Sequence, residues 1–266
     1  MIRSYSSLAS CYDRMTPDVN YSKYADVCLR LAARYGVSPK LALDLACGTG
    51  SLSLELSCRG VEMIGVDASG EMLSEAFSKS SSAGKNILFL CQKMEELDLY
   101  GTVDAVFCCL DSVNHLNDIH ALKKAFSRVG LFLEPGGVFI FDVITRERML
   151  RLDTSAYIRE ADGVFCTYRY SFDKRRNRMH IDLDIFTENS RGSYRRECEQ
   201  ITETPFSLSE LDQALSEAGM TRKSVHGEFT VRPARSADER ITVVAVRDGV
   251  FRGVSGPSPE ENKESR

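Results

Sequence analysis

A glycine-rich turn early in the chain has the residue types and the spacing of a ligand-binding loop. The segment Asp44–Gly50 reads Asp-Leu-Ala-Cys-Gly-Thr-Gly and lies at the end of a short apolar run. Glycine lets the backbone approach a ligand more closely than a residue with a Cβ atom does. A helix that begins just after the turn would offer free backbone N–H groups to polar or anionic ligand atoms. Taken alone, the same residues are also typical of a tight connection between a strand and a helix.

An acidic residue, Asp67, ends the next apolar run of the sequence. A carboxylate accepts two hydrogen bonds side by side, so it can bind both hydroxyl groups of a ribose. The alternative is that Asp67 caps a helix, because Ala68–Glu71 is a typical helix start. With the glycine turn upstream, we favour the interpretation of Asp67 as a ribose-binding residue.

A third segment, Asp111–His115, carries a group that is suited to proton transfer. The ordinary pKa of histidine lies near neutrality, so His115 can act as a general base. The alternative is that His115 only packs at the start of a helix. The remaining histidines, His120, His180 and His226, have no partner pattern around them, and we assign them no role.

Residues 1–150 contain the elements that would position these groups. After a polar lead-in over residues 1–18, short apolar runs alternate with helical patterns. Such alternation predicts a parallel sheet that is covered by helices on both faces. An open sheet of this kind binds its ligand at the carboxyl ends of the strands. We expect strands at 41–46, 62–66, 87–91, 103–109 and 138–143, and helices at 21–35, 52–58, 70–78 and 119–132.

The pattern changes after residue 150. Segments 165–172, 178–186 and 194–202 alternate apolar with polar residues, which predicts an antiparallel meander with one solvated face. A helix at 207–218, capped by Ser207 or Ser209 with Glu210, and two strands at 222–230 and 240–246 would follow. We therefore divide the chain into a binding domain (1–150 and 204–248), an antiparallel insert (151–203) and a disordered tail (249–266).

Composition narrows the class of protein further. The 266 residues carry a net charge of −4, whereas a nucleic-acid binder usually has a basic surplus. No apolar run is long enough for a membrane span, and the N-terminus lacks a secretory signal, so we expect a cytoplasmic protein. The nine cysteines are odd in number and form no C-x-x-C pair, so we expect reduced thiols and no metal site.

The motifs together resemble the class I S-adenosylmethionine-dependent methyltransferases. The resemblance rests on Asp44–Gly50, on Gly65–Ser69 (Gly-Val-Asp-Ala-Ser) and on Leu133–Asp142 (Leu-Glu-Pro-Gly-Gly-Val-Phe-Ile-Phe-Asp). Position 53 is Ser rather than the third glycine of the dinucleotide fingerprint, which disfavours NAD. The resemblance implies a doubly wound, Rossmann-like, mostly parallel sheet of seven strands with a small antiparallel β insert.

The resemblance also implies a role for each matching residue. Asp44 would anchor the loop and the amino-acid end of the cofactor, and Asp67 would hold the ribose. Leu110 and Asp111 would lie near the transferable methyl group. Ala46, Gly48 and Gly50, with Cys47 between them, would lie along the methionine and ribose, and Ala68 and Met72 would flank the adenine. Tyr12 and Tyr24 resemble the aromatic residues of an N-terminal lid, although packing into a helical core is an equal alternative.

One segment departs from the family pattern. Members often carry Asp-Met after the third strand, where the Asp accepts a hydrogen bond from the adenine amino group. Here the sequence is Gln92-Lys93-Met94-Glu95, and a lysine has no acceptor atom. Gln92 or Glu95 could supply the acceptor, or only the backbone of Met94 makes the contact. We therefore expect weaker adenine recognition than is usual in the family.

The expected reaction is methyl transfer from S-adenosylmethionine to N or O of a small molecule, which leaves S-adenosylhomocysteine. The segment around His115 resembles Ser-x-Gly-His-Leu of the aminosugar N,N-dimethyltransferases, with Asn114 in place of the glycine. There the histidine is implicated as a base. The insert would wall the acceptor pocket or form a homodimer contact, so a monomer or a homodimer is expected. The alternatives are a methyltransferase that acts on RNA or protein, and a cofactor-binding protein without activity.

A cluster of basic residues marks the first turn of the expected meander. Such a cluster could bind a phosphorylated acceptor, but basic residues at a hairpin tip are more often simply solvated. The cluster consists of Arg169, Lys174, Arg175, Arg176 and Arg178.

Overall fold

The computed structural model describes residues 8–189 and 192–249, which form two sheets. The larger sheet has seven strands in the order β10-β11-β5-β4-β1-β2-β3. Strands β1 to β5 run parallel, and β11 runs antiparallel to both of its neighbours. The strands are β1 (Leu41–Leu45), β2 (Glu62–Asp67), β3 (Leu88–Cys91), β4 (Val103–Cys108), β5 (Leu133–Ile144), β10 (Met220–Gly227) and β11 (Arg240–Arg247). The predicted seven-stranded, mostly parallel sheet is thus confirmed.

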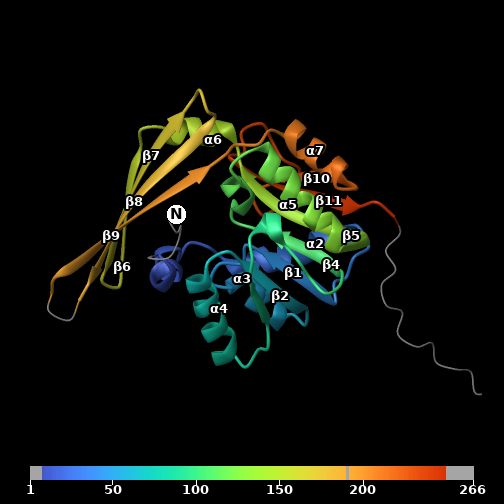
Figure 1. Cartoon of the computed structure of the whole chain (residues 1–266), viewed down its shortest axis with the longest axis horizontal. Helices are drawn as coiled ribbons and strands as arrows, with labels where there is room; N and C mark the ends of the chain where they lie inside the picture. Colours follow the sequence, from blue (N-terminus) through green and yellow to red (C-terminus); the bar gives the residue numbers. More distant parts are fainter. Residues whose placement is uncertain (1–7, 190–191, 250–266) are drawn as a thin grey trace, which may run out of the picture.

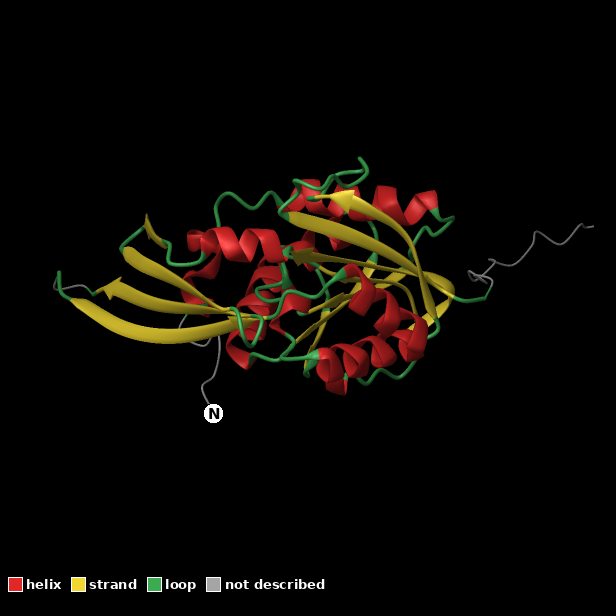
Figure 2. Cartoon of the chain, turned by 90° about the horizontal axis from the view of Figure 1, so that it is seen from above, coloured by secondary structure: helices red, strands yellow, loops and turns green. Residues whose placement is uncertain are grey.

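Helices cover both faces of this sheet (Figures 1 and 2). Leu31 of α2 (Tyr21–Arg34) and Leu56 of α3 (Ser51–Cys58) are buried in the core on one face. On the other face, Phe126 of α5 (Ile119–Phe132) is buried with residues of α7 (Leu208–Glu217). The remaining long helix of the binding domain is α4 (Gly70–Ser82), which contacts β2 and β3. The apolar spacing of the sequence predicts these helices because each one buries a single face.

The sequence also predicts how α7 begins. Ser207 accepts a hydrogen bond from the backbone of Glu210, and the Glu210 carboxylate accepts one from the Ser207 backbone at 2.8 Å. This reciprocal pair is a capping box, so Ser207 rather than Ser209 is the cap.

The smaller sheet is antiparallel and has the order β6-β7-β8-β9. Its strands are β6 (Ala156–Ala161), β7 (Val164–Asp173), β8 (Arg178–Glu188) and β9 (Tyr194–Glu203). The predicted antiparallel insert is confirmed, but it has one strand more than the sequence pattern indicates. Strand β6 was missed because all its residues except Ala161 are exposed, so it lacks the alternation of a half-buried strand. The short helix α6 (Arg146–Leu152), between the two sheets, was missed as well.

The first described residues, from Leu8 to Met15, pack on the inner face of the smaller sheet (Figure 1). Leu8, Cys11 and Met15 are buried there with Leu183 and Ile185 of β8. The prediction of a polar lead-in is therefore wrong for Ala9–Cys11 and Tyr12–Met15, which form the short helices η1 and α1. Three apolar residues at helical spacing were enough to anchor this segment, although most of its other residues are polar.

All nine cysteines are free, and five of them are buried. Among the described residues, no helix is long and apolar enough to cross a membrane. The expected disordered tail lies outside the described residues, apart from residue 249.

Candidate functional site

The glycine turn leads from β1 into α3, at the carboxyl edge of the parallel strands. Ala46, Gly48 and Gly50 all have positive φ angles, of 59°, 54° and 71°. A Cβ atom on Gly48 would point into open space, with no atom within 4 Å. On Gly50 it would lie 2.8 Å from the Cβ of Ala76, so this glycine is required by the packing of α4. The turn thus leaves open space beside Gly48 at the edge where ligands bind.

Two buried or half-buried carboxylates flank this turn. Asp67 accepts backbone N–H groups from Gly48 and Ser69, both at 2.8 Å. The cap of α4 is Ser69, whose hydroxyl accepts from Met72, so the alternative of Asp67 as the cap does not hold. Asp44 is almost fully buried and accepts from the Ser53 hydroxyl at 2.6 Å. Burial raises the pKa of both carboxyls, that of Asp44 to about 7.

The residues expected around an adenine lie at the ends of β2 and β3. Ala68 is exposed, whereas Met72 is buried in the first turn of α4. The side-chain amide of Gln92 is engaged at both ends by the backbone of Asp98, at 3.1 and 2.9 Å. Lys93 is exposed and lies 3.7 Å from Glu96. Among the described residues of this segment, the Met94 backbone and Glu95 remain as the candidate adenine partners.

The N-terminal segment contacts the same turn. The hydroxyl of Thr49 donates to Asp13 at 2.7 Å, and Lys79 of α4 forms an ion pair with the same carboxylate. The side chain of Tyr24 stacks on Phe229 with ring centroids 3.6 Å apart. Tyr12 is half-buried, and burial, followed by the neighbouring Tyr21 and Asp111, raises the pKa of its hydroxyl.

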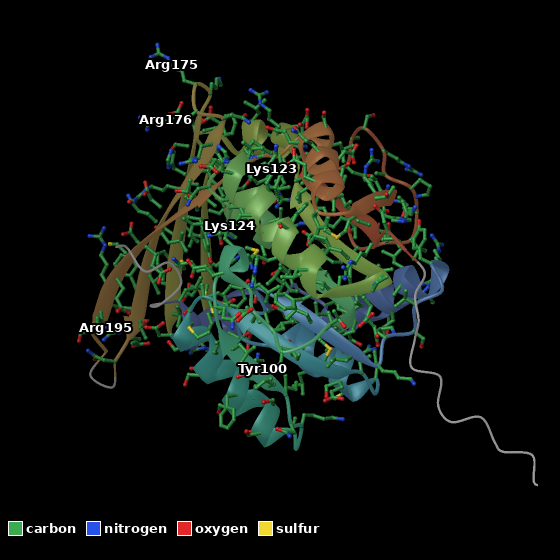
Figure 3. The ribbon with its side chains drawn as sticks, turned by 45° about the vertical axis from the view of Figure 1, so that its right-hand side comes forward. Tyr100, Lys123, Lys124, Arg175, Arg176 and Arg195 are labelled. Carbon is green, nitrogen blue, oxygen red and sulfur yellow. The ribbon has the colours of Figure 1, made fainter. Side chains whose placement is uncertain are left out.

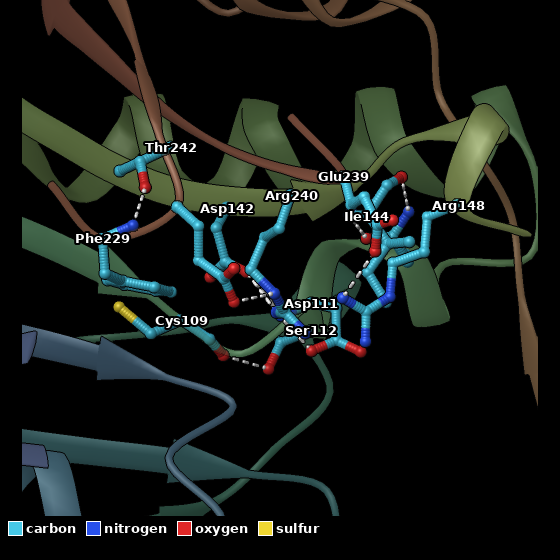
Figure 4. A network of polar contacts seen from close by, with 12 residues as sticks. Cys109, Asp111, Ser112, Asp142, Ile144, Arg148, Phe229, Glu239, Arg240 and Thr242 are labelled. Atoms are coloured by element: carbon cyan, nitrogen blue, oxygen red, sulfur yellow. Dashed lines mark hydrogen bonds and ion pairs between the residues drawn. The ribbon is translucent and has the colours of Figure 1, made fainter. Parts of the chain in front are cut away.

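A strained turn follows β4. Leu110 and Asp111 have φ angles of 62° and 55°, which residues other than glycine rarely adopt in succession. The backbone N–H of Asp111 donates to Asp142 at 2.9 Å. Nη1 of Arg240 lies 2.6 Å from Asp111 and 2.5 Å from Asp142, so one guanidinium group joins both carboxylates (Figure 4). These bonds fix the direction of the Asp111 side chain at the end of the strand.

His115 and Asp111 are brought together with Glu203, which sequence reasoning missed. One ring nitrogen of His115 and one carboxylate oxygen from each of Asp111 and Glu203 lie within 4.8 Å of one another. A ring N–H of His115 also donates to the backbone of Thr202, the neighbour of Glu203 in β9. The insert therefore contributes directly to the site. The signal that could have identified Glu203 is weak, because the buried face of β9 alternates Glu199, Ile201 and Glu203, with Glu203 opposite Met179.

The charged groups of this cluster influence one another's pKa values. Burial alone would raise the pKa of Asp111, but the positive charges of Arg240 and His115 outweigh it and lower the pKa. Burial lowers the pKa of His115 more than the Asp111 charge raises it. Burial and the charge of Asp111 raise the pKa of Glu203 to about 8. At neutral pH the cluster thus consists of an ionised Asp111, a neutral His115 and a protonated Glu203.

Asn114 holds these segments in register. It is fully buried, and its amide nitrogen donates to the carbonyl oxygens of Thr204 (2.9 Å) and Ile144 (3.3 Å). Its oxygen accepts the N–H of Ile144 at 2.9 Å. One side chain therefore ties the segment after β4 to the ends of β5 and β9.

The basic cluster at the β7–β8 turn does not converge on a site. Figure 3 shows Arg175 and Arg176 pointing outward at the tip of the hairpin. Arg169 pairs with Asp184 on the sheet at 2.9 Å, and Arg178 donates to the backbone of Asn117. These cations point in different directions, as expected of a solvated hairpin tip.

Comparison with known proteins gives a consistent result. A family model described as a methyltransferase domain matches residues 42–137. The putative methyltransferase YqeM of Bacillus subtilis is 30% identical over 243 residues, which cover 89% of this chain and 94% of the relative.

Two solved structures share the architecture. An S-adenosylmethionine-dependent methyltransferase from Clostridium acetobutylicum has a TM-score of 0.83 and 29% identity, covering 92% of this chain and 99% of its own. CalS10 of Micromonospora echinaspora, an amino pentose methyltransferase solved with S-adenosylmethionine bound, has a TM-score of 0.70 and 22% identity. The match covers 90% of this chain and 95% of CalS10.

Proposed function

The chain belongs to the class I S-adenosylmethionine-dependent methyltransferases, and on this premise we propose that its acceptor is a small molecule. The observation that carries the proposal is the position of Thr202 and Glu203. Strand β9 brings both residues to His115, so the groups suited to proton transfer lie between the two sheets rather than on an open surface. Such a site suits a small acceptor better than a macromolecule. CalS10 is described as an amino pentose methyltransferase, and an amino pentose is a small-molecule acceptor of the proposed class.

The residues of the glycine turn, together with Asp44 and Asp67, fit S-adenosylmethionine. The open space beside Gly48 is a place where a Cβ atom would obstruct a ligand. Each oxygen of Asp67 accepts one backbone N–H, which leaves a further lone pair on each for the ribose hydroxyls. In this proposal Asp44 holds the amino-acid end. The remaining contacts would come from Ala46, Cys47, Gly48, Ala68, Met72, Met94, Leu110 and the lid residues Tyr12 and Tyr24.

When bound, S-adenosylmethionine supplies a methyl group on a positively charged sulfur, and the protein supplies position and proton transfer. His115 would take a proton from the acceptor at the ring nitrogen that does not donate to Thr202. The ionised Asp111 would stabilise the resulting imidazolium, since its charge already raises the pKa of that ring. Arg240 would keep Asp111 oriented and ionised during this step.

A transfer assay tests this proposal. The purified protein would be incubated with methyl-labelled S-adenosylmethionine and, separately, with a small-metabolite extract, total RNA and total protein. We expect label in the metabolite fraction, and loss of that label in the His115→Asn variant. Label only in RNA or protein would contradict the proposed acceptor class. Cofactor binding without label in any fraction would instead indicate a protein that binds the cofactor without catalysis.

A further inference from the structure

Glu203 is a buried carboxyl group that has no counter-ion of its own. Its exposed fraction is 6%, and it lies on the inner face of the insert. Arg240 forms its ion pairs with Asp111, Asp142 and Glu228. Arg148, the other cation near Glu203, lies 3.5 Å from Glu239. No described cation lies within ion-pair distance of Glu203.

The groups that face Glu203 come from five elements. They are Asp111 after β4, His115 of the short helix η3 (Ser112–His115), Arg148 of α6, Tyr170 of β7 and Arg240 of β11. Asp111 and Asp142 already share the single charge of Arg240, so an ionised Glu203 would be a further, uncompensated negative charge in the interior. Such a charge is costly unless it is paired or protonated. The proton that Glu203 keeps at neutral pH therefore occupies the place of a missing cation.

From this arrangement we propose that Glu203 is an acceptor-binding residue that selects acceptors arriving as ammonium ions. The inference rests on the proposed function, because it concerns the acceptor side of the same site. An ammonium group satisfies the charge that Glu203 lacks, whereas a neutral hydroxyl group does not. The exchange conserves atoms and charge: the carboxylic acid releases its proton to solvent, and the carboxylate then pairs with the ammonium group. His115 subsequently accepts one N–H proton from the bound ammonium, which frees the nitrogen lone pair for methylation.

A divalent metal ion is the competing occupant of the three groups. Asp111, His115 and Glu203 have the donor atoms that such an ion prefers. However, the guanidinium group of Arg240 lies 2.6 Å from Asp111 and would repel a second cation of higher charge. An ammonium ion can instead bind at Glu203 alone, which leaves the Arg240 pair intact. The structure therefore favours the proton and the ammonium group over a metal ion.

The test follows the carboxyl carbons of glutamate by NMR in the full-length protein, labelled with ¹³C and saturated with S-adenosylhomocysteine. One carboxyl carbon should titrate with a pKa of about 8, far above an ordinary glutamate. Methylammonium chloride should lower that midpoint by about one unit or more, because an opposite charge close to a carboxyl favours its ionised form. Methanol, a neutral probe of similar size, should leave it unchanged.

Two variants assign the signal. Glu203→Gln should remove it without loss of folding at neutral pH, because glutamine resembles the protonated carboxyl. Glu199→Gln, a matched change at another buried glutamate of β9, should retain it. The titration of the wild-type protein tests the proposal even if a variant does not fold. If every glutamate carboxyl titrates at the pKa of an ordinary glutamate, the proposal is overturned.

Other results also overturn it. A titration midpoint of the Glu203 carboxyl that does not change when methylammonium is added would mean that Glu203 does not bind ammonium. Displacement of the proton by micromolar Mg²⁺, Mn²⁺ or Zn²⁺ would identify a metal site instead. Calorimetry with S-adenosylhomocysteine distinguishes failure of the proposed cofactor site from failure of the proposed role of Glu203. Absence of that binding contradicts the proposed cofactor site, whereas binding without a response to methylammonium contradicts the role of Glu203 alone.

Discussion

The side-chain nitrogen of Asn114 donates to the carbonyl oxygen of Thr204 at 2.9 Å, across 90 residues of sequence. This bond connects the segment that contains His115 to the end of the strand that contains Glu203. The same side chain bonds both the N–H and the carbonyl oxygen of Ile144 in β5. One buried amide thus links the insert to two parts of the binding domain.

Replacing Asn114 by Ala should destabilise the protein by about 1–3 kcal/mol, because it leaves buried backbone groups without partners. Turnover should fall as well, since His115 and Glu203 lose their common anchor. Chemical unfolding measures the first effect, with Asn117→Ala, at an exposed position, as the control. Equal stability of Asn114→Ala and wild type would show that the amide is not a structural link.

Asp44 predicts a dependence of stability on pH. Its pKa is raised from 3.8 to about 7, so the folded state binds more protons than the unfolded state between these values. Stability due to Asp44 therefore falls as pH rises through this range. Asp44→Asn removes this cost: its advantage over wild type should grow between about pH 4 and 7, to roughly 1–4 kcal/mol. The control is Glu62→Gln at an exposed site, which should show no such trend. The same Asp44→Asn variant should bind S-adenosylhomocysteine more weakly.

The lowered pKa of His115 predicts how turnover depends on pH. Burial lowers its pKa below 6.5, so the ring is neutral at pH 7 and loses its capacity as a base only at lower pH. Turnover of an identified acceptor should be level near neutrality and fall on acidification. His115→Asn should reduce kcat by about 100-fold or more and abolish that acidic decline. An unchanged turnover in this variant would contradict the role of His115 as a base.

Replacing Lys93 by Asp should increase the affinity of the protein for S-adenosylhomocysteine. The Lys93 side chain is 61% exposed and lacks an acceptor, at the position where the resemblance to the family implies an aspartate. Lys93→Asp should strengthen binding of S-adenosylhomocysteine by roughly 10-fold, the equivalent of one added hydrogen bond to a charged group. Lys93→Ala removes the lysine without adding an acceptor, so it should show no comparable gain. Equal affinities of the two variants would contradict the hypothesis of a weakened adenine site.

Much of the fold could be predicted from local sequence. Strands β1, β4 and β5 are largely buried on both faces, so they read as apolar runs between helical patterns. Local pattern failed where burial does not alternate, as in β6, and where tertiary packing anchors a mostly polar segment, as in α1. The α1 segment depends on neighbours that are distant in sequence, whereas β6 is an exposed edge strand that pairs with the adjacent β7.

The same reason limits prediction of the site. The glycine turn and Asp67 belong to one local unit, so their spacing identifies them. Arg240, in contrast, bonds to Asp111 across 129 residues of sequence, and the sequence around either residue does not indicate its partner. Glu203 is likewise separated from His115 by a complete insert. A charged residue at the start of an apolar strand is a sequence signal for Arg240, whereas the mostly polar sequence of β9 gives no such signal for Glu203.

The most direct test of the central claim is calorimetric titration of the protein with S-adenosylhomocysteine, with NAD as the control ligand. We predict micromolar binding of S-adenosylhomocysteine and none of NAD. Asp67→Ala should weaken binding by roughly 100-fold, because Asp67 is proposed to accept two ribose hydrogen bonds and also bonds Gly48. Glu62→Ala, at the other end of β2, should bind like wild type. No binding to wild type, or equal binding to Asp67→Ala, would contradict the proposed cofactor site.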